Sequence, residues 1–244
     1  MNETIAGKNP VLEALKAGRE INKIFLGENV TKDRVFQEII NIAKVNKIPV
    51  QNVAKTKIDD LTETTKHQGI VAIVAIKEYA SLEEIVQKKP LSETPIILMV
   101  DGIEDPYNLG AIIRTCDAVG AVGVIIPNRR NVGLTGIVSK ASAGAVEYVP
   151  VARVTNLAQT IGELKEIGFW VVGCEASGDK TIYEIDLKMP LVLVVGGEGK
   201  GISRLVQEKC DFLVSLPMVG NISSLNASVA ASICLYEALK QRIS

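Results

Sequence analysis

Histidine and aromatic residues are scarce in this sequence. Among 244 residues there is one histidine, and phenylalanine, tyrosine and tryptophan together make up 4%. A single histidine excludes a metal site built from several imidazoles. His67 also lies in a polar stretch without the partner pattern of a serine–histidine–aspartate triad. We therefore expect no multi-histidine metal site and no triad chemistry.

Closely spaced cysteine pairs are absent as well. The four cysteines, Cys116, Cys174, Cys210 and Cys234, are scattered along the chain and form no CxxC motif. Structural zinc sites and dithiol redox sites both depend on such pairs. We expect these thiols to be reduced and mostly buried.

The chain also lacks an excess of charge of either sign. It has 27 lysines and arginines against 28 aspartates and glutamates, for a formal net charge of -1. This balance does not point to a nucleic-acid-binding protein. It does not exclude one either, because a local basic face matters more than the total charge.

Long apolar runs are missing. No run approaches the roughly 20 residues that a membrane-spanning helix needs. The start, Met1-Asn2-Glu3-Thr4, lacks the basic and then apolar pattern of a secretory signal. With 47% hydrophobic residues, the chain still has ample material for a globular core. We expect a cytoplasmic protein with no membrane partner.

Residues 1–77 predict a small α/β domain. Three strand-like segments are rich in apolar residues: 21–26, 50–53 and 70–76. Apolar residues between Val35 and Ala43 recur at helical spacing. Asn9, followed by a proline, predicts the start of a further short helix that ends at Gly18. A polar stretch with prolines then predicts a linker over 78–95, in which Ser81 can cap a short helix.

Residues 96–244 predict a larger α/β domain with a mainly parallel sheet. Five strand-like runs occur at 96–100, 122–126, 169–173, 191–195 and 212–216. Most are apolar throughout, as expected of parallel strands that are buried on both faces. Helical stretches separate them, which is typical of crossover connections.

A polar turn follows the first of these strands. Asp105-Pro106 and Asn108 favour a turn, and a helix is expected over 111–118. Arg114 then lies near the first turns of an element that follows the carboxyl end of a strand, where open α/β sheets place their sites. Taken alone, this position favours a solvated charge on a helix over a functional residue.

A glycine-rich loop follows the strand 191–195. Glycines at 196, 197, 199 and 201 let a backbone approach a ligand closely. A phosphate-binding P-loop needs Ser or Thr after its lysine, but Lys200 is followed by Gly201. The dinucleotide-binding fingerprint fails too, because Arg204 stands where it requires glycine.

A third loop, Pro217 to Asn226, follows the strand 212–216. Asn226 is suited to cap the helix expected over 227–240, whose first half is rich in alanine and serine. By itself this segment is as consistent with a plain capped helix as with a binding loop.

Together the three segments resemble the SpoU/TrmH branch of the SPOUT RNA ribose 2′-O-methyltransferases. That family has an Asn-x-Gly-x-x-x-Arg-Thr turn, a Gly-x-Glu-x-x-Gly loop and a Pro-x-x-Gly-x-x-x-Ser-Leu-Asn loop. Here they stand, in the same order, at 108–115, 196–201 and 217–226. The start at 5–11 is similar to the RNA-binding domain of the rRNA-modifying members, and the likeness is greatest to those that methylate guanosine.

The resemblance implies a trefoil-knotted C-terminal domain, a rare exception to the rule that chains avoid knots, and a small N-terminal RNA-binding domain. It also implies a homodimer without metal. S-adenosylmethionine would be held by Gly196, Gly197, Leu216, Met218 and Leu225. The catalytic set would be Arg114, Asn108, Glu198, Ser224 and Asn226. RNA contacts are expected from Lys8, Arg19, Lys23, Arg129 and Arg130.

The implied reaction is attack by a ribose 2′-oxygen on the methyl group of a sulfonium. The family assigns the activating role to the arginine that matches Arg114. A guanidinium with a pKa above about 12 is a poor base, so neutralising a phosphate or stabilising the alkoxide is physically easier. A guanosine of large-subunit rRNA is the expected target, with a tRNA guanosine as the alternative. A non-catalytic RNA-binding protein and a nucleotide- or NAD-binding enzyme remain competing hypotheses.

Overall fold

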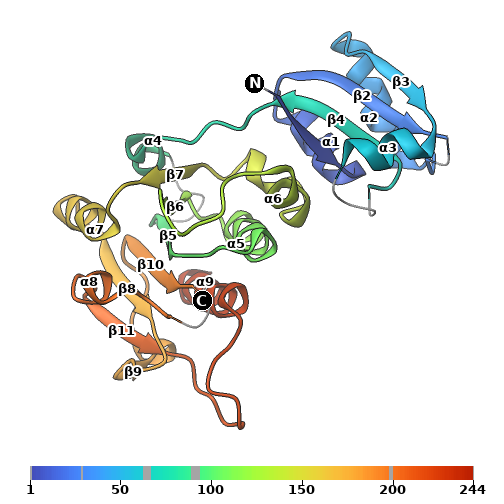
Figure 1. Cartoon of the computed structure of the whole chain (residues 1–244). Helices are drawn as coiled ribbons and strands as arrows, with labels where there is room; N and C mark the ends of the chain where they lie inside the picture. The colour runs from blue at the N-terminus through green and yellow to red at the C-terminus, as the bar shows by residue number, and fades with distance from the viewer. Residues whose placement is uncertain (1, 29, 63–66, 89–93, 198–199, 244) are drawn as a thin grey trace. The chain divides into compact units, whose positions relative to one another are not determined.

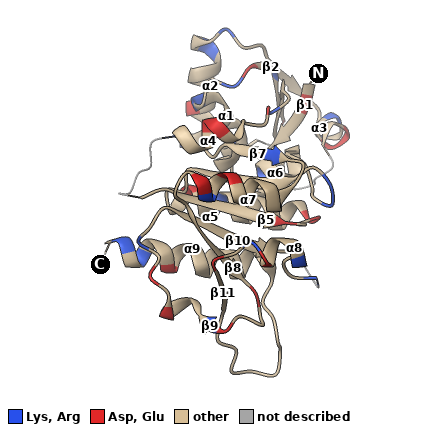
Figure 2. Ribbon diagram, turned by 90° about the vertical axis from the view of Figure 1, so that its left-hand side faces the viewer, with Lys and Arg blue, Asp and Glu red and all other residues tan. Residues whose placement is uncertain are grey.

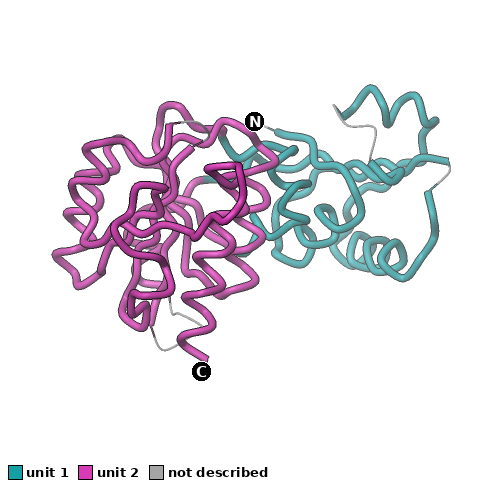
Figure 3. The backbone as a smooth tube through the Cα atoms, turned by 90° about the horizontal axis from the view of Figure 1, so that it is seen from below, with its two compact units in different colours: residues 1–78, 133–148 teal, residues 79–132, 149–244 magenta. Residues whose placement is uncertain are grey.

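A computed structural model describes residues 2–28, 30–62, 67–88, 94–197 and 200–243 (Figure 1). The chain forms two compact units (Figure 3). The N-terminal unit comprises Met1–Glu78 and Gly133–Tyr148, and the C-terminal unit comprises Tyr79–Val132 and Val149–Ser244. Lysine and arginine are interspersed with aspartate and glutamate along the elements of each unit (Figure 2). No helix of the described residues is long and apolar enough to cross a membrane.

The N-terminal unit contains a four-stranded sheet of order β1-β4-β2-β3. Its strands are β1 (Asn2–Ala6), β2 (Ile21–Gly27), β3 (Val50–Val53) and β4 (Ile70–Ala75), and only the β2–β3 pair is parallel. Side chains alternate between its two faces. Ile24 and Leu26 pack with the helices α1 (Lys8–Lys16) and α2 (Arg34–Val45), whereas Phe25 packs with Ile58 of α3 (Lys55–Leu61).

The first helix differs slightly from the one expected. Helix α1 begins at Lys8, and its N-cap is Gly7, with φ 108° and no side-chain cap, instead of Asn9. Strand β1 was not predicted, because its residues Asn2–Ala6 carry little apolar pattern until they pair with β4. The three predicted strands of this unit are present.

The segment 133–148 packs with the N-terminal unit, although it lies far along the chain. It forms α6 (Gly136–Ala141) and a short 3-10 helix, η1 (Ala145–Glu147). Its glycines permit close approach, because a Cβ on Gly136 would collide with the carbonyl oxygen of Thr4. Contiguous domains of 1–77 and 96–244 remain a prediction, and the compact units cut across them at this segment.

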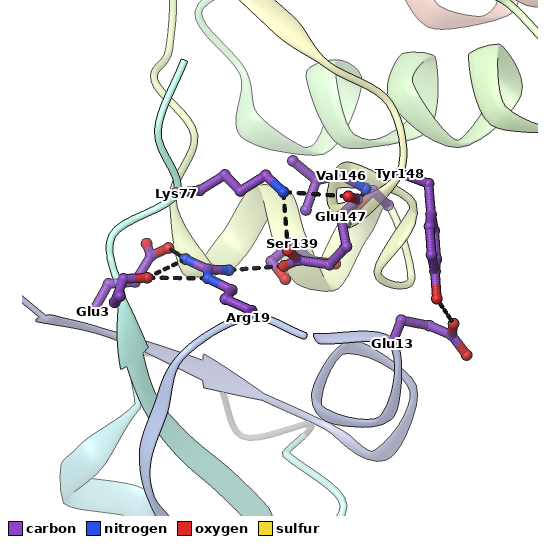
Figure 4. Close-up of polar contacts among 10 residues, drawn as sticks. Glu3, Glu13, Arg19, Lys77, Ser139, Val146, Glu147 and Tyr148 are labelled. Carbon is purple, nitrogen blue, oxygen red and sulfur yellow. Dashed lines mark hydrogen bonds and ion pairs between the residues drawn. The ribbon is translucent and has the colours of Figure 1, made fainter. Parts of the chain in front are cut away.

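Buried ion pairs hold this segment in place (Figure 4). The Glu147 side chain is completely buried and lies 2.8 Å from Arg19 Nη1 and 3.1 Å from Lys77 Nζ. Arg19 also pairs with Glu3 and donates to the carbonyl oxygen of Ala75. A buried charge without such partners would be costly, so these contacts belong to the core of the unit.

The C-terminal unit is built on a seven-stranded sheet of order β7-β6-β5-β10-β8-β11-β9, with every pair parallel. The strands are β5 (Ile96–Asp101), β6 (Gly123–Pro127), β7 (Val151–Val154), β8 (Trp170–Cys174), β9 (Lys180–Thr181), β10 (Leu191–Gly196) and β11 (Phe212–Ser215). The predicted α/β fold with a mainly parallel sheet is confirmed. The short strands β7 and β9 were not predicted, and the trefoil knot stays a prediction.

Helices cover both faces of this sheet (Figure 1). One face carries α5 (Pro106–Ala118) and α9 (Ala227–Ile243), which lie side by side and are joined by a 2.9 Å hydrogen bond between Thr115 and Ser232. The other face packs with α4 (Leu82–Gln87), α7 (Leu157–Glu166) and α8 (Arg204–Gln207). Ser81 caps α4 in a capping box, as expected, and this part of the predicted linker packs in the C-terminal unit.

The strand order places a switch point between β5 and β10. From β5 the chain adds β6 and β7 on one side, and the later strands lie on the other side. At the carboxyl edge, Gly196 of β10 is paired with Asp101 of β5. Crevices at such switch points are where α/β proteins bind ligands.

Candidate active site

Two adjoining pockets open at this edge of the C-terminal unit. The larger has a volume of about 770 Å³ and is bordered by the ends of β8, β10 and β11. The smaller has a volume of about 420 Å³ and lies at the end of β5. Both walls include Gly197, Lys200 and Gly201, so the two pockets are neighbours.

All five residues predicted to bind the cofactor line the larger pocket: Gly196, Gly197, Leu216, Met218 and Leu225. The structure therefore brings together two loops that are separated in the sequence. Ser224 of the predicted catalytic set lines the same pocket. Cys174 and Glu175, at the end of β8, contribute to it as well and were not predicted.

The glycine loop forms a wall of the larger pocket and leaves no room for side chains on its glycines. A Cβ on Gly196 would collide with the backbone of Gly201, and a Cβ on Gly197 would collide with the carbonyl oxygen of Gly102. Gly201 has φ +61°, and a Cβ there would meet the carboxylate of Glu175. That carboxylate accepts a 2.8 Å hydrogen bond from the amide of Ile202. Glycine is thus required for backbone approach at this wall and not for the geometry of a P-loop.

Asn226 connects the third loop to the first. Its Oδ1 accepts hydrogen bonds from the Ser228 amide at 2.9 Å and the Val229 amide at 3.3 Å, which confirms its capping of α9. Its Nδ2 donates to Oδ1 of Asn108 at 3.0 Å. Asn108 is buried near the start of α5 and also lines the smaller pocket.

Arg114 is placed differently from the other predicted residues. It lies on α5, exposed to solvent, and lines neither of the two pockets. Helix α5 begins at Pro106 with Asp105 as its N-cap, earlier than the predicted 111–118, so Asn108 and Arg114 share one rigid helix. Glu198 lies outside the described residues.

The predicted RNA contacts of the N-terminal unit have close protein partners. Lys8 Nζ lies 2.6 Å from Asp33 and 2.7 Å from the carbonyl oxygen of Thr31, and this ammonium lowers the pKa of the Asp33 carboxyl. The Arg19 side chain is only 7% exposed within its ion pairs. Lys23 lies over the ring of Phe25, 5.3 Å from its centre. An RNA role for these three residues stays a prediction.

The two arginines after β6 are both exposed. Arg130 lines the smaller pocket, and its backbone has φ 56°, which is unusual for a residue with a side chain. Arg129 lines neither pocket. Arg130 thus shares the lining of the smaller pocket with the predicted catalytic residue Asn108, and an RNA role for both arginines stays a prediction.

The thiols and acidic groups form no metal-binding cluster in the described part of the chain. All four cysteines are free thiols, and Cys116 and Cys234 are buried. Burial raises the pKa of Cys210 to about 12, so this thiol stays protonated at neutral pH.

The sequence profile of the SpoU rRNA Methylase family matches residues 95–236. The chain belongs to this family. A second profile, for the substrate-binding domain of RNA 2′-O ribose methyltransferases, matches residues 4–80. As a family member, the protein is an S-adenosylmethionine-dependent RNA methyltransferase with a separate substrate-binding domain.

Similar proteins cover almost the whole chain. A Bacillus subtilis protein named for the TrmH family of tRNA/rRNA methyltransferases is 50% identical over 99% of this chain and 96% of its own length. The AdoMet complex of the SpoU methyltransferase AviRb from Streptomyces viridochromogenes is 25% identical, with a TM-score of 0.80 over 100% of this chain and 91% of that chain. An AdoMet-bound rRNA methyltransferase from Sinorhizobium meliloti is 26% identical, with a TM-score of 0.82 over 100% and 88%.

Proposed function

We propose that this protein methylates the ribose 2′-hydroxyl of a guanosine in large-subunit rRNA. The observation that carries the proposal is the pair of adjoining pockets at the β5–β10 switch point, which share Gly197, Lys200 and Gly201. Transfer of a methyl group needs a donor site and an acceptor site in contact. One pocket has a glycine wall and apolar side chains, and the other is polar.

The larger pocket fits the methyl donor. Its volume of about 770 Å³ lies within the range of roughly 300–1,000 Å³ that is usual for small-molecule sites. Main-chain groups at Gly196 and Gly197 can contact polar atoms, while Leu216, Met218 and Leu225 offer apolar surface. When bound, S-adenosylmethionine supplies a methyl group on a sulfonium, which departs as a neutral thioether and needs no acid.

The protein's own task is to position and activate the acceptor hydroxyl. Alignment of the 2′-oxygen with the methyl group is an orientation effect that a rigid site can supply. The Asn108–Asn226 hydrogen bond holds the start of α5 against the start of α9 and so fixes the wall beside the acceptor. Arg114 supplies positive charge, which stabilises the developing alkoxide or a neighbouring phosphate more readily than it removes a proton.

Arg114 reaches the reaction in a homodimer. Within one chain it lines neither pocket, which supports delivery of Arg114 of the partner subunit to the acceptor. Exposed apolar side chains at Val219, Ile222, Val229 and Tyr236 lie on the third loop and on α9, the helix beside α5. Such surface is typical of an interface between subunits.

Large-subunit rRNA is preferred over tRNA as the substrate. The match of residues 4–80 to a substrate-binding domain supports a large and structured RNA, and the Sinorhizobium meliloti neighbour is named an rRNA methyltransferase. The Bacillus subtilis relative is named for both tRNA and rRNA, so a tRNA guanosine is the second candidate. Both substrates place the protein in the cytoplasm.

The test uses purified protein, methyl-labelled S-adenosylmethionine, and rRNA and tRNA from cells that lack the protein. We expect label in one 2′-O-methylguanosine of large-subunit rRNA. Label only in tRNA would select the second candidate. Calorimetry without detectable binding of the methyl donor would contradict the enzyme and favour an RNA-binding role, whereas tight binding of NAD or ATP instead would favour a nucleotide-binding enzyme.

A further inference from the structure

The smaller pocket combines acidic and basic side chains. Asp101, Glu104 and Asp105 follow one another closely at the end of β5, and Arg130 and Lys200 contribute positive charge from other segments. A pocket for a phosphate alone would not need three carboxylates. The wall thus offers hydrogen-bond acceptors on one side and charge for an anion on the other.

Two of the three carboxylates already accept hydrogen bonds from backbone amides of the protein. Oδ2 of Asp101 accepts a 2.8 Å hydrogen bond from the amide of Ser203. Oδ1 of Asp105 accepts one of 2.9 Å from the amide of Tyr107 and caps α5. Glu104 is exposed, and its carboxylate has no hydrogen bond or ion pair to the described part of the chain. It is the carboxylate with both oxygens available to a ligand.

The backbone beside Glu104 is held firmly. The amide of Ile103 donates to the Asn131 side chain at 3.0 Å, and the carbonyl oxygen of Ile103 accepts from the Val132 amide at 2.8 Å. Gly102 makes the preceding turn with φ +85°. An acceptor on such a fixed loop is positioned before the ligand arrives, which favours specificity.

We propose that the smaller pocket receives the target nucleotide and that the Glu104 carboxylate reads its guanine base; this rests on the function proposed above. Guanine presents two adjacent donors on its Watson–Crick edge, N1–H and N2–H, which match the two oxygens of a carboxylate. Adenine and cytosine present one donor beside one acceptor, and uracil one donor between acceptors. Each of these would direct a lone pair at a carboxylate oxygen.

The position of the pocket agrees with this occupant. A base beside Glu104 leaves its ribose toward the boundary with the larger pocket, where Gly197 and Gly201 line both pockets. Arg130 and Lys200 are then available to the flanking phosphates, which carry register and affinity but no base information. Glu104 therefore determines specificity, separately from the residues that act on the 2′-hydroxyl.

The experiment compares wild type with Glu104→Gln on transcripts of the mapped rRNA segment that carry G, A, C or U at the target. Because a glutamine amide offers one acceptor and one donor, it matches the donor and acceptor of adenine and no longer matches the paired N1–H and N2–H donors of guanine. We expect wild type to prefer G over A in kcat/KM, and Glu104→Gln to lower this ratio by about tenfold or more. Calorimetry should show unchanged affinity for S-adenosylmethionine.

Glu166→Gln is the matched control, because Glu166 is exposed at the end of α7 and lines neither pocket. It should leave both the G-to-A ratio and the donor affinity unchanged. An unchanged ratio in Glu104→Gln would overturn the inference, as would a parallel loss of donor affinity, which would assign the pocket to the donor. A mapped target other than guanosine would overturn base reading while leaving methyl transfer to RNA intact. If no RNA became labelled, the result would contradict the proposed function itself.

Discussion

Arg19 and Glu147 of the N-terminal unit lie in a buried network, whereas Glu104 and Arg114 of the C-terminal unit are exposed to solvent. Arg19 and Glu147 have each other, Glu3 and Lys77 as partners. Glu104 has no hydrogen bond or ion pair to the described residues. Charges with buried partners therefore stabilise a unit, whereas charges held on rigid elements without partners are available to a ligand.

Glu147→Gln should lower the free energy of unfolding by about 3 kcal/mol, because Arg19 and Lys77 lose a fully buried partner. Urea unfolding of the full chain measures the change. The matched control is Glu208→Gln, whose exposed pair with Arg204 should contribute less than about 1 kcal/mol. Equal losses in the two variants would contradict the distinction.

On the functional side, Arg114→Ala should reduce kcat/KM for rRNA methylation by about 100- to 1,000-fold, as removal of a group that stabilises developing charge does. The free energy of unfolding and the affinity for S-adenosylmethionine should stay unchanged, because Arg114 is exposed and lines neither pocket. Arg204→Ala, at another exposed arginine, serves as the control. Wild-type turnover in Arg114→Ala would contradict a role of Arg114 in the reaction.

The glycine wall allows a sharper comparison of two alanine substitutions. Gly197→Ala places a Cβ against the carbonyl oxygen of Gly102, so it should weaken donor binding at least about tenfold and destabilise the fold by about 1–3 kcal/mol. Gly162→Ala in α7 meets nothing within 4 Å and should stabilise the protein by about 0.5–1 kcal/mol. Calorimetric titration and thermal unfolding measure the two effects. Unaltered donor affinity in Gly197→Ala would argue against this wall as the cofactor site.

The features of the two units that can be predicted from the sequence are local ones. Apolar runs predict the buried parallel strands, and the resemblance of the three loops to the SpoU/TrmH motifs predicts five of the residues that line the larger pocket. Arg19 shows what local patterns miss: its partner Glu147 is 128 residues away, so its burial could not be foreseen. Glu104 was missed for a related reason, since its importance depends on which neighbouring carboxylates are already hydrogen-bonded.

Asn226 caps α9 and also contacts Asn108 of α5, so it combines a structural role with a proposed functional one. Asn226→Ala should cost about 1 kcal/mol of stability through loss of the cap on α9. Asn226→Asp keeps an oxygen to accept from the Ser228 and Val229 amides but removes the donor to Asn108. We therefore expect near-normal unfolding in Asn226→Asp together with a lower kcat, because the wall beside the acceptor loses the hydrogen bond between Asn226 and Asn108. If the two variants lost kcat only in proportion to their stability, Asn226 would be a helix cap and nothing more.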